Sequence, residues 1–290
     1  MKPLFTIAAA FLTFAVGSAP AQAPKKPDPV DQIAATLTPS QIVVYKEVDD
    51  RKLELHVFAA KDAQPGERRP CLVAIHGGGW TGGEPKRFYP FAAHFTDQGM
   101  VGVSVQYRLA KKDGSVTVFD CVKDVRSALR YLKAHAAELG IDPDRMIVSG
   151  GSAGGHLAAA TAQFDDINAE SDDLSIDPTP AGLILYFPVI DTSSEGYGQA
   201  KIGDDWEKLS PLHRVKPGLP PTLVLHGTGD TVTPFKGAAA FTEAMKKAGN
   251  RCELIVNEGG RHGYLMFDRA LYDKAMTDSE TFVRSLGWIP

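Results

Sequence analysis

A serine with two glycines on one side and an alanine and two glycines on the other occurs at Gly150-Gly151-Ser152-Ala153-Gly154-Gly155, after the apolar run Met146–Val148. This arrangement is typical of a nucleophile elbow, in which a strand turns sharply into a helix and the serine takes a strained backbone conformation. Gly150 and Gly154 supply the small residues that such a turn requires two positions before and after the serine. We therefore expect Ser152 to present its hydroxyl at a helix start, where backbone N–H groups face whatever the serine attacks.

A second glycine motif, His76-Gly77-Gly78-Gly79-Trp80, follows the apolar run Cys71–Ile75, which is typical of a buried strand. Consecutive glycines allow the backbone to approach a ligand closely and allow amide groups to converge on a developing negative charge. We predict an oxyanion hole formed by the N–H groups of Gly78, Gly79 and Ala153. His76 is expected to brace this loop rather than to take part in chemistry.

Two further polar side chains follow apolar runs and complete a possible catalytic triad. Asp230 lies in a glycine-rich turn after Leu223–Leu225, and His262 lies in another after Cys252–Val256. A serine hydroxyl is a poor nucleophile unless an imidazole takes its proton, and the imidazole needs an acceptor that fixes its tautomer. We predict Ser152, Asp230 and His262 as the catalytic residues. Asp191 also ends a predicted strand and is the alternative acid.

With these motifs in the order Ser, Asp, His, the chain resembles the α/β-hydrolase superfamily from about Ile42 to Trp288. Within the superfamily it looks like bacterial esterases that carry HGGG and G-x-S-A-G-G, both hormone-sensitive-lipase-like esterases and the feruloyl and acetyl-xylan esterase-like group. The first group usually has an aspartate where this chain has Gly151 and a helical cap before the core, where this chain has only a short segment. The resemblance therefore favours the second group and implies carbohydrate-linked acyl esters as substrates.

The alternation of apolar runs and helical spacing predicts an α/β fold, specifically an α/β-hydrolase domain at residues 42–290. Its sheet is expected to be eight-stranded and mostly parallel, with helices on both faces. The strands are predicted at residues 42–48, 52–58, 71–75, 100–105, 145–149, 181–187, 222–225 and 253–256. Helices are predicted at residues 120–137, 235–248 and 270–286. Residues 191–219 break the alternation and are expected to form a small cap insertion.

Two tryptophans are candidate substrate-binding residues. Trp80 directly follows the glycines of the predicted oxyanion loop, and Trp206 lies in the predicted cap insertion. We expect Trp80 to contact substrate and Trp206 to line the acyl or sugar pocket. For Trp206, packing of the cap onto the core is an equally good interpretation.

The N-terminus has the composition of a signal peptide. Lys2 precedes the apolar stretch Leu4–Val16, and small residues follow at Gly17–Ala23. Cleavage is expected after Ala21 or after Ala23, so residues 1–21 or 1–23 would be removed, with a retained membrane anchor as the alternative. Residues 24–41 are expected to be a loose lead-in. The mature protein is expected to be secreted or periplasmic and not bound to a membrane.

Composition limits the classes of partner. The 290 residues carry a formal net charge of −4 and a pI near 6.1. This charge gives no overall positive potential that would attract nucleic acid. There are three cysteines, Cys71, Cys121 and Cys252, and their wide spacing argues against a zinc site. Because their number is odd, at least one thiol lies outside any intramolecular disulfide. No pattern indicates an oligomeric state.

These features together predict an exported serine esterase that needs no metal and no organic cofactor. Its substrate would be a small-molecule or carbohydrate-linked ester, such as a short acyl, acetyl or feruloyl ester. An exported serine peptidase of the same fold is the first alternative, because similar triads occur in peptidases. A non-catalytic binding protein that retains the fold is the second.

Overall fold

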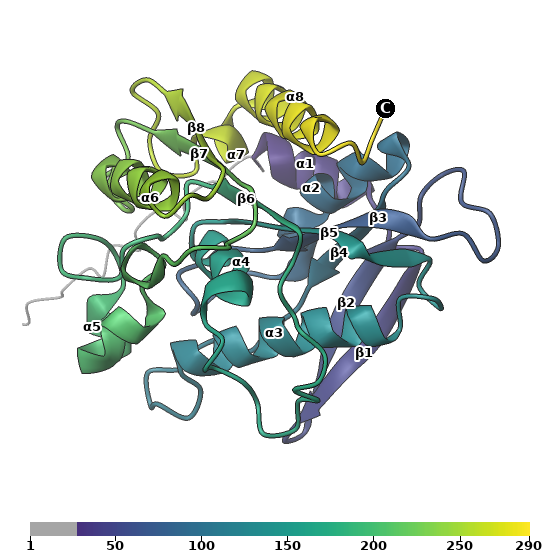
Figure 1. Ribbon diagram of the computed structural model, residues 1–290, viewed down its shortest axis with the longest axis horizontal. Helices are drawn as coiled ribbons and strands as arrows, with labels where there is room; N and C mark the ends of the chain where they lie inside the picture. The colour runs from purple at the N-terminus through teal and green to yellow at the C-terminus, as the bar shows by residue number, and fades with distance from the viewer. Residues whose placement is uncertain (1–27) are drawn as a thin grey trace, which may run out of the picture.

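The computed structural model describes residues 28–290, which form a single eight-stranded sheet covered by helices on both faces (Figure 1). The strands are β1 (Gln41–Val48), β2 (Arg51–Phe58), β3 (Arg69–Ile75), β4 (Val101–Val105), β5 (Ile141–Gly151), β6 (Gly182–Tyr186), β7 (Thr222–Gly227) and β8 (Cys252–Asn257). All eight predicted strands are confirmed, and the first two are joined by a turn in which Asp49 has a φ of 53°.

The sheet has the order β1-β2-β4-β3-β5-β6-β7-β8. β2 pairs antiparallel with both of its neighbours, and every pair from β4 to β8 is parallel. β3 and β5 are adjacent in the middle of the sheet. The helical segment that follows β3 covers one face of the sheet, and the helix that follows β4 covers the other face. Ligands of parallel sheets bind at such a switch point, beyond the carboxyl ends of the strands. The two glycine motifs therefore meet there, because they follow β3 and β5.

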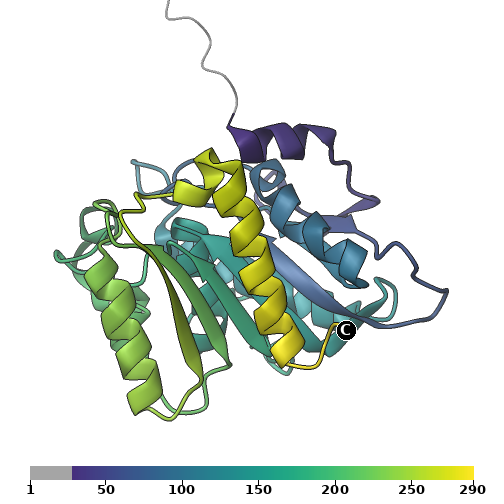
Figure 2. The ribbon, with the colours of Figure 1, turned by 90° about the horizontal axis from the view of Figure 1, so that it is seen from above.

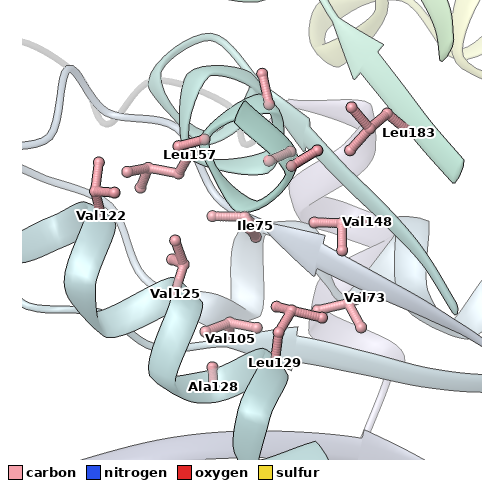
Figure 3. Close-up of a cluster of buried hydrophobic side chains, with 14 of the residues drawn as sticks. Val73, Ile75, Val105, Val122, Val125, Ala128, Leu129, Val148, Leu157 and Leu183 are labelled. Atoms are coloured by element: carbon pink, nitrogen blue, oxygen red, sulfur yellow. The ribbon is translucent and has the colours of Figure 1, made fainter. Parts of the chain in front are cut away.

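One face of the sheet is covered by α3 (Val118–Ala134), α4 (Ala153–Gln163) and α6 (Phe235–Lys247). Figure 3 shows Val125 and Leu129 of α3 directed toward Val105 and Val73 of the sheet, and all four side chains are fully buried. Burying an aliphatic side chain of this size stabilises a protein by about 1.5–3 kcal/mol. The helical spacing recognised in the sequence thus marks the core-facing side of α3. This helix begins earlier than predicted because Thr117 and Asp120 cap it reciprocally.

The opposite face is covered by α1 (Pro29–Thr36), α2 (Tyr89–His94) and α8 (Arg269–Ser285), which lie together in Figure 2. Two short 3₁₀ helices flank α2, namely η1 (Pro85–Phe88) and η2 (Phe95–Gln98). The predicted loose lead-in is wrong where α1 lies, because Val30 and Ala34 occupy one side of this helix and are buried against the core.

The cap segment, residues 191–219, lies between β6 and β7 and forms short helices instead of a separate domain. These are α5 (Gln199–Ile202), η3 (Gly203–Leu209) and η4 (Leu212–Arg214). All three cysteines are buried and unpaired. Within residues 28–290, no helix is both long enough and apolar enough to cross a membrane. The predicted signal peptide lies outside the described residues.

Candidate active site

Ser152 lies at the turn between β5 and α4, where the strand ends and the helix begins. Its φ of 57° and ψ of −122° place it in a region that side chains rarely adopt. A Cβ added to Gly150 would collide with the carbonyl oxygen of Gly154, and one added to Gly154 would collide with that of Ile75. Only glycine allows the strand, the turn and the helix to pack this closely, as the sequence motif predicted.

His262 connects the serine to a carboxylate. Its Nε2 lies 2.9 Å from Ser152 Oγ, and its Nδ1 lies 2.8 Å from Asp230 Oδ2. The Asp230 side chain is fully buried, whereas 23% of the His262 side chain is exposed. Asp191, the alternative acid, instead accepts a hydrogen bond from the Ser193 amide. The structure thus brings together the three residues predicted from the sequence and assigns the carboxylate position to Asp230.

The Asp230 carboxylate is held as an anion by several donors. Its Oδ1 accepts hydrogen bonds from the amides of Val232 and Thr233, each at 2.8 Å, and the Thr233 hydroxyl lies 2.9 Å from Oδ2. Burial on its own would raise the pKa of Asp230, but the hydrogen bonds from His262 and Thr233 outweigh it and hold the pKa below its ordinary value. Asp230 therefore stays ionised at neutral pH and can stabilise a positive charge on His262.

Of the predicted oxyanion donors, Gly78 and Gly79 line the same cavity as Ser152, and Ala153 directly follows the serine. Within the described chain, the amides of Gly78 and Gly79 donate no hydrogen bond to another group, and Ala153 is the first residue of α4, where helical amides have no partner inside the helix. Gly78 has a φ of 117°, and a Cβ there would collide with the backbone of Gly82. His76 braces the loop, since its Nδ1 lies 2.8 Å from the Gly77 carbonyl oxygen and its ring stacks on Tyr107.

A cavity of about 410 Å³ opens above Ser152 and His262. Its apolar walls come from several loops and helices: Phe88, Phe187, Val232, Met266 and Phe267. α7 (Tyr264–Phe267) contributes the last two of these side chains and packs on α1. Arg87, also on the cavity wall, forms an ion pair with Asp28 before α1. The N-terminal helix therefore helps to shape the substrate cavity.

The prediction that Trp80 contacts substrate is wrong in this structure. Trp80 is fully buried and has a φ of 63°, and its indole Nε1 donates to His156 Nδ1 at 3.3 Å. His156 Nε2 lies 2.6 Å from the Leu209 carbonyl oxygen in the cap segment. Trp80 thus connects the oxyanion loop to α4, which carries His156, and His156 in turn connects α4 to the cap segment.

Trp206 does not line the cavity either, so that prediction is also wrong. Its ring packs edge-on against His213, with 5.1 Å between the ring centroids, and both residues belong to the cap segment. The alternative interpretation of Trp206 as a packing residue fits the structure. The aromatic residue that the cap segment brings to the cavity is Tyr197.

Sequence reasoning missed three residues that surround the triad. Thr233 contacts both Asp230 and His262, Phe187 packs edge-on against the His262 ring at a centroid distance of 5.3 Å, and Tyr197 lines the cavity. Of these three residues, only Phe187 has a feature in the sequence that indicates the site. It directly follows the sixth strand, at the sheet edge where the site lies. Within residues 28–290, no group of His, Cys, Asp and Glu side chains is arranged to hold a metal ion.

Comparison with known proteins agrees with this geometry. The chain is 40% identical to Thermogutta terrifontis esterase 2, whose structure phosphoramylated by tabun superposes with a TM-score of 0.81 and covers 86% of this chain and 95% of that one. The chain belongs to the α/β-hydrolase esterases. The family model BD-FAE matches residues 55–180 of this esterase, and that of the Prolyl oligopeptidase family matches residues 183–282.

Curated relatives point to the same family. The esterase is 31% identical to carboxylesterase NlhH of Mycobacterium tuberculosis over 226 residues, which cover 68% of this chain and 67% of the relative. It is 30% identical to esterase LipQ of the same organism over 213 residues, which cover 67% of this chain. The match spans only 50% of LipQ, so this esterase covers about half the length of that relative.

Proposed function

We propose that this protein is a serine carboxylesterase that acts on short acyl esters through an acyl-enzyme. The observation that carries the proposal is the pair of hydrogen-bond distances at His262, 2.9 Å to Ser152 Oγ and 2.8 Å to Asp230 Oδ2. A hydroxyl, an imidazole and a buried carboxylate in this order can generate a nucleophile at neutral pH.

In the proposed reaction, Ser152 Oγ attacks the ester carbonyl carbon while His262 Nε2 takes the hydroxyl proton. Asp230 keeps the proton of His262 on Nδ1 and stabilises the imidazolium that forms. The amides of Gly78, Gly79 and Ala153 donate to the tetrahedral oxyanion. His262 then protonates the departing alcohol, and water attacks the acyl-enzyme by the same route, which releases the acid.

The size and lining of the cavity support short acyl groups. Its volume of about 410 Å³ is bounded by apolar side chains, among them Phe88, Val232 and Met266. Structures of Thermogutta terrifontis esterase 2 have been solved with propionate and with butyrate bound. For simple aliphatic esters, acyl chains of two to four carbons are therefore the ones that we propose as substrates of this esterase.

A more specific proposal concerns the alcohol part of the natural ester. We propose that the acyl group is linked to plant carbohydrate, as in acetylated xylan or a feruloylated sugar. The support is the resemblance of the two glycine motifs to the feruloyl and acetyl-xylan esterase-like group.

We also propose that the protein is exported. The support is the composition of the apolar stretch Leu4–Val16 and of the small residues that follow it. Recovery of the protein from a periplasmic or culture fraction would test export. Its first residue should be Gln22 after cleavage behind Ala21, or Pro24 after cleavage behind Ala23. An intact N-terminus in a membrane fraction would instead indicate a retained anchor.

A serine peptidase is the second candidate function. The match of residues 183–282 to the Prolyl oligopeptidase family favours it, because this part of the chain carries Asp230 and His262. Amide and ester hydrolysis use the same acyl-enzyme chemistry, so the triad alone does not separate the two activities. A non-catalytic binding protein is the weaker alternative, because the serine, the imidazole and the carboxylate are all in hydrogen-bond contact.

The test compares the wild-type protein with Ser152→Ala on acetyl, butyryl and octanoyl nitrophenyl esters, methyl ferulate, acetylated xylan and a dipeptide amide. We expect the acetyl and butyryl esters to be hydrolysed fastest and the substitution to lower kcat by at least about 10⁴-fold. Paraoxon, which phosphorylates Thermogutta terrifontis esterase 2, should add one phosphoryl adduct to the wild type and none to the variant, as measured by mass spectrometry.

Other outcomes of this panel decide against parts of the proposal. Hydrolysis of the dipeptide amide without hydrolysis of any ester would establish the peptidase instead. Hydrolysis of the nitrophenyl esters without that of methyl ferulate or acetylated xylan would remove the carbohydrate link and leave a carboxylesterase. An unreactive wild-type protein that is folded by circular dichroism would favour the binding protein.

A further inference from the structure

A second and larger cavity lies beside the substrate cavity. Its volume is about 850 Å³, and it opens between the loop that leads into α3 and the helices α5 and η3 of the cap segment. Figure 1 shows α5 and the start of α3 at the same end of the molecule. The cavity contains none of the triad residues, and the reaction described above does not use it.

The charge of this cavity is opposite in sign to that of the whole chain. Lys111, Lys112 and Lys201 line it together with one carboxylate, Asp205, although the chain has a net charge of −4. Asp205 forms an ion pair at 2.7 Å with Lys208, which is not a lining residue. The lining of this cavity therefore contains three lysines and one carboxylate that is already paired.

The three lysines have no carboxylate partner of their own. Among the described residues, none of them forms an ion pair within 4.0 Å. The nearby Asp113 accepts hydrogen bonds from Ser115, and its charge interacts with that of Lys111 only at longer range. Unpaired like charges around one concave surface raise the local positive potential and attract an anion. The cavity is thus suited to a ligand that brings its own negative charge.

Lys201 connects this cavity to the catalytic one. Its Nζ donates to the Gly79 carbonyl oxygen at 3.1 Å and to the Tyr197 hydroxyl at 2.7 Å, and both of those residues line the cavity above Ser152. Lys201 thus links the cap segment, to which it and Tyr197 belong, to Gly79 of the oxyanion loop. The two cavities therefore adjoin at Lys201, which lines one of them and contacts two residues that line the other.

We propose that the lysine cavity is an anion subsite, with which this esterase selects esters that carry a carboxylate or another anionic group remote from the reacting carbonyl. The inference rests on the proposed esterase function and adds a substrate class to it. Lys201 is the specificity-determining residue, because it touches both cavities, and Lys111 and Lys112 contribute further charge. The anionic group can belong to the alcohol part or to the acyl part of the ester.

Two matched pairs of esters distinguish these sources. The alcohol pair is 4-(acetoxymethyl)benzoate and its neutral amide, 4-(acetoxymethyl)benzamide. The acyl pair is monoethyl adipate and its neutral amide, ethyl 5-carbamoylpentanoate. Within each pair the reacting ester is the same and only the remote charge differs, so the ratio of kcat/KM for the anionic over the neutral ester reports recognition of charge.

We expect the wild-type protein to prefer the anionic member of one pair, and that pair identifies the part of the substrate that enters the subsite. Each lysine replaced by glutamine should lower this ratio by about threefold to fivefold, as for a solvent-accessible ion pair. The variants are Lys201→Gln and the double variant Lys111→Gln with Lys112→Gln. Added salt should lower the wild-type ratio, because mobile ions screen accessible charges.

Two controls separate charge recognition from a structural effect. Lys201→Arg keeps the charge and should restore most of the ratio, whereas a purely structural role for Lys201 would change the rates of both esters in a pair equally. Lys274→Gln removes one charge from α8, where the lysine pairs with Asp278, and should leave the ratio at its wild-type value.

The two hypotheses fail in different ways. Equal kcat/KM for the anionic and neutral esters of both pairs, with rapid hydrolysis of all four, would overturn the subsite and leave the esterase function intact. Absence of hydrolysis of all four esters and of the nitrophenyl esters would overturn the esterase function itself. A preference for anionic esters that persists in every lysine variant would also overturn the subsite.

Discussion

The catalytic loops and the cap segment lie against each other but are built on different principles. In the catalytic loops, residues 76–80, 150–155, 227–233 and 257–263, function depends on backbone geometry and on pairs of polar atoms at strand ends. In the cap segment, aromatic rings are placed by packing. Trp206 turns toward His213, while Tyr197 reaches the cavity. Local motifs therefore specify the first region, and only the complete tertiary structure specifies the second.

The largest expected effect within the catalytic loops follows from Asp230→Asn. The amides of Val232 and Thr233 both donate to Oδ1, so the asparagine oxygen must occupy that position and its NH₂ group must face His262 Nδ1. The histidine then carries its proton on Nε2 and cannot accept one from the serine. We expect kcat for a nitrophenyl ester to fall by about 10³- to 10⁴-fold.

Asp191→Asn is the matched control for this substitution. Asp191 follows the neighbouring strand but contacts the Ser193 amide, so its loss should change kcat by less than about twofold. A large loss in this variant together with a small loss in Asp230→Asn would reverse the assignment of the acid.

The second effect concerns the boundary between the two regions, at Trp80. Trp80→Ala removes a fully buried indole, and we expect the free energy of unfolding in urea to fall by about 3–5 kcal/mol. Trp80→Phe keeps most of the packing and removes the hydrogen bond to His156, so it should cost about 0.5–1.5 kcal/mol. A loss below about 1 kcal/mol in the alanine variant would show that the ring is accessible, as the sequence suggested.

These predictions also show how far the sequence specifies the site. Ser152, Asp230 and His262 were identifiable because each follows an apolar strand in a glycine-containing turn, and parallel strands bring their carboxyl ends to one edge. Trp80 was misassigned because its burial depends on His156 and Leu209, which are distant in sequence. No local pattern reports such a contact.

The fold shows the same division. Every strand was predicted from its own apolar residues, whereas α1 was missed because its proline- and alanine-rich sequence is typical of a loose segment. Only the apolar surface that receives Val30 and Ala34 explains why this segment is helical. Thr233 was missed for a related reason, since the turn after β7 sets its contact with Asp230.

The third effect is a dependence of stability on pH. Burial lowers the pKa of His156 to about 4, compared with about 6.5 in an unfolded chain. Between these values the unfolded state binds a proton that the folded state excludes, so the free energy of unfolding decreases as the pH falls from about 6.5 to about 4. The contribution of this residue at about pH 4 is on the order of 3 kcal/mol.

Urea unfolding at several pH values measures this contribution. His156→Gln removes the titrating group, so the stability of this variant should decrease less steeply below about pH 6.5 than that of the wild type. Trp206→Ala, in the cap segment, is the control because it removes no titratable group, and it should keep the wild-type slope. Identical slopes for all three proteins would mean that His156 is not a buried neutral imidazole.

The smallest effect is expected for Trp206→Ala, in the cap segment. Because the ring packs on His213 and does not line the substrate cavity, kcat/KM for nitrophenyl butyrate should change by less than about twofold. Tyr197→Phe, which removes a hydroxyl from the cavity wall, is the comparison variant. A loss of more than about tenfold in Trp206→Ala alone would restore this tryptophan as a substrate-binding residue.

The backbone origin of the oxyanion hole has a consequence for how this protein can change over evolutionary time. No side-chain substitution other than proline can delete an amide donor, and at Gly78 or Gly154 even a methyl group would collide with neighbouring backbone. The side chains that line the cavity, such as Val232 and Met266, are free of that constraint. A mutational library should therefore tolerate almost nothing at the glycines and much at the cavity wall, so that new substrates become accessible without any change in the reaction.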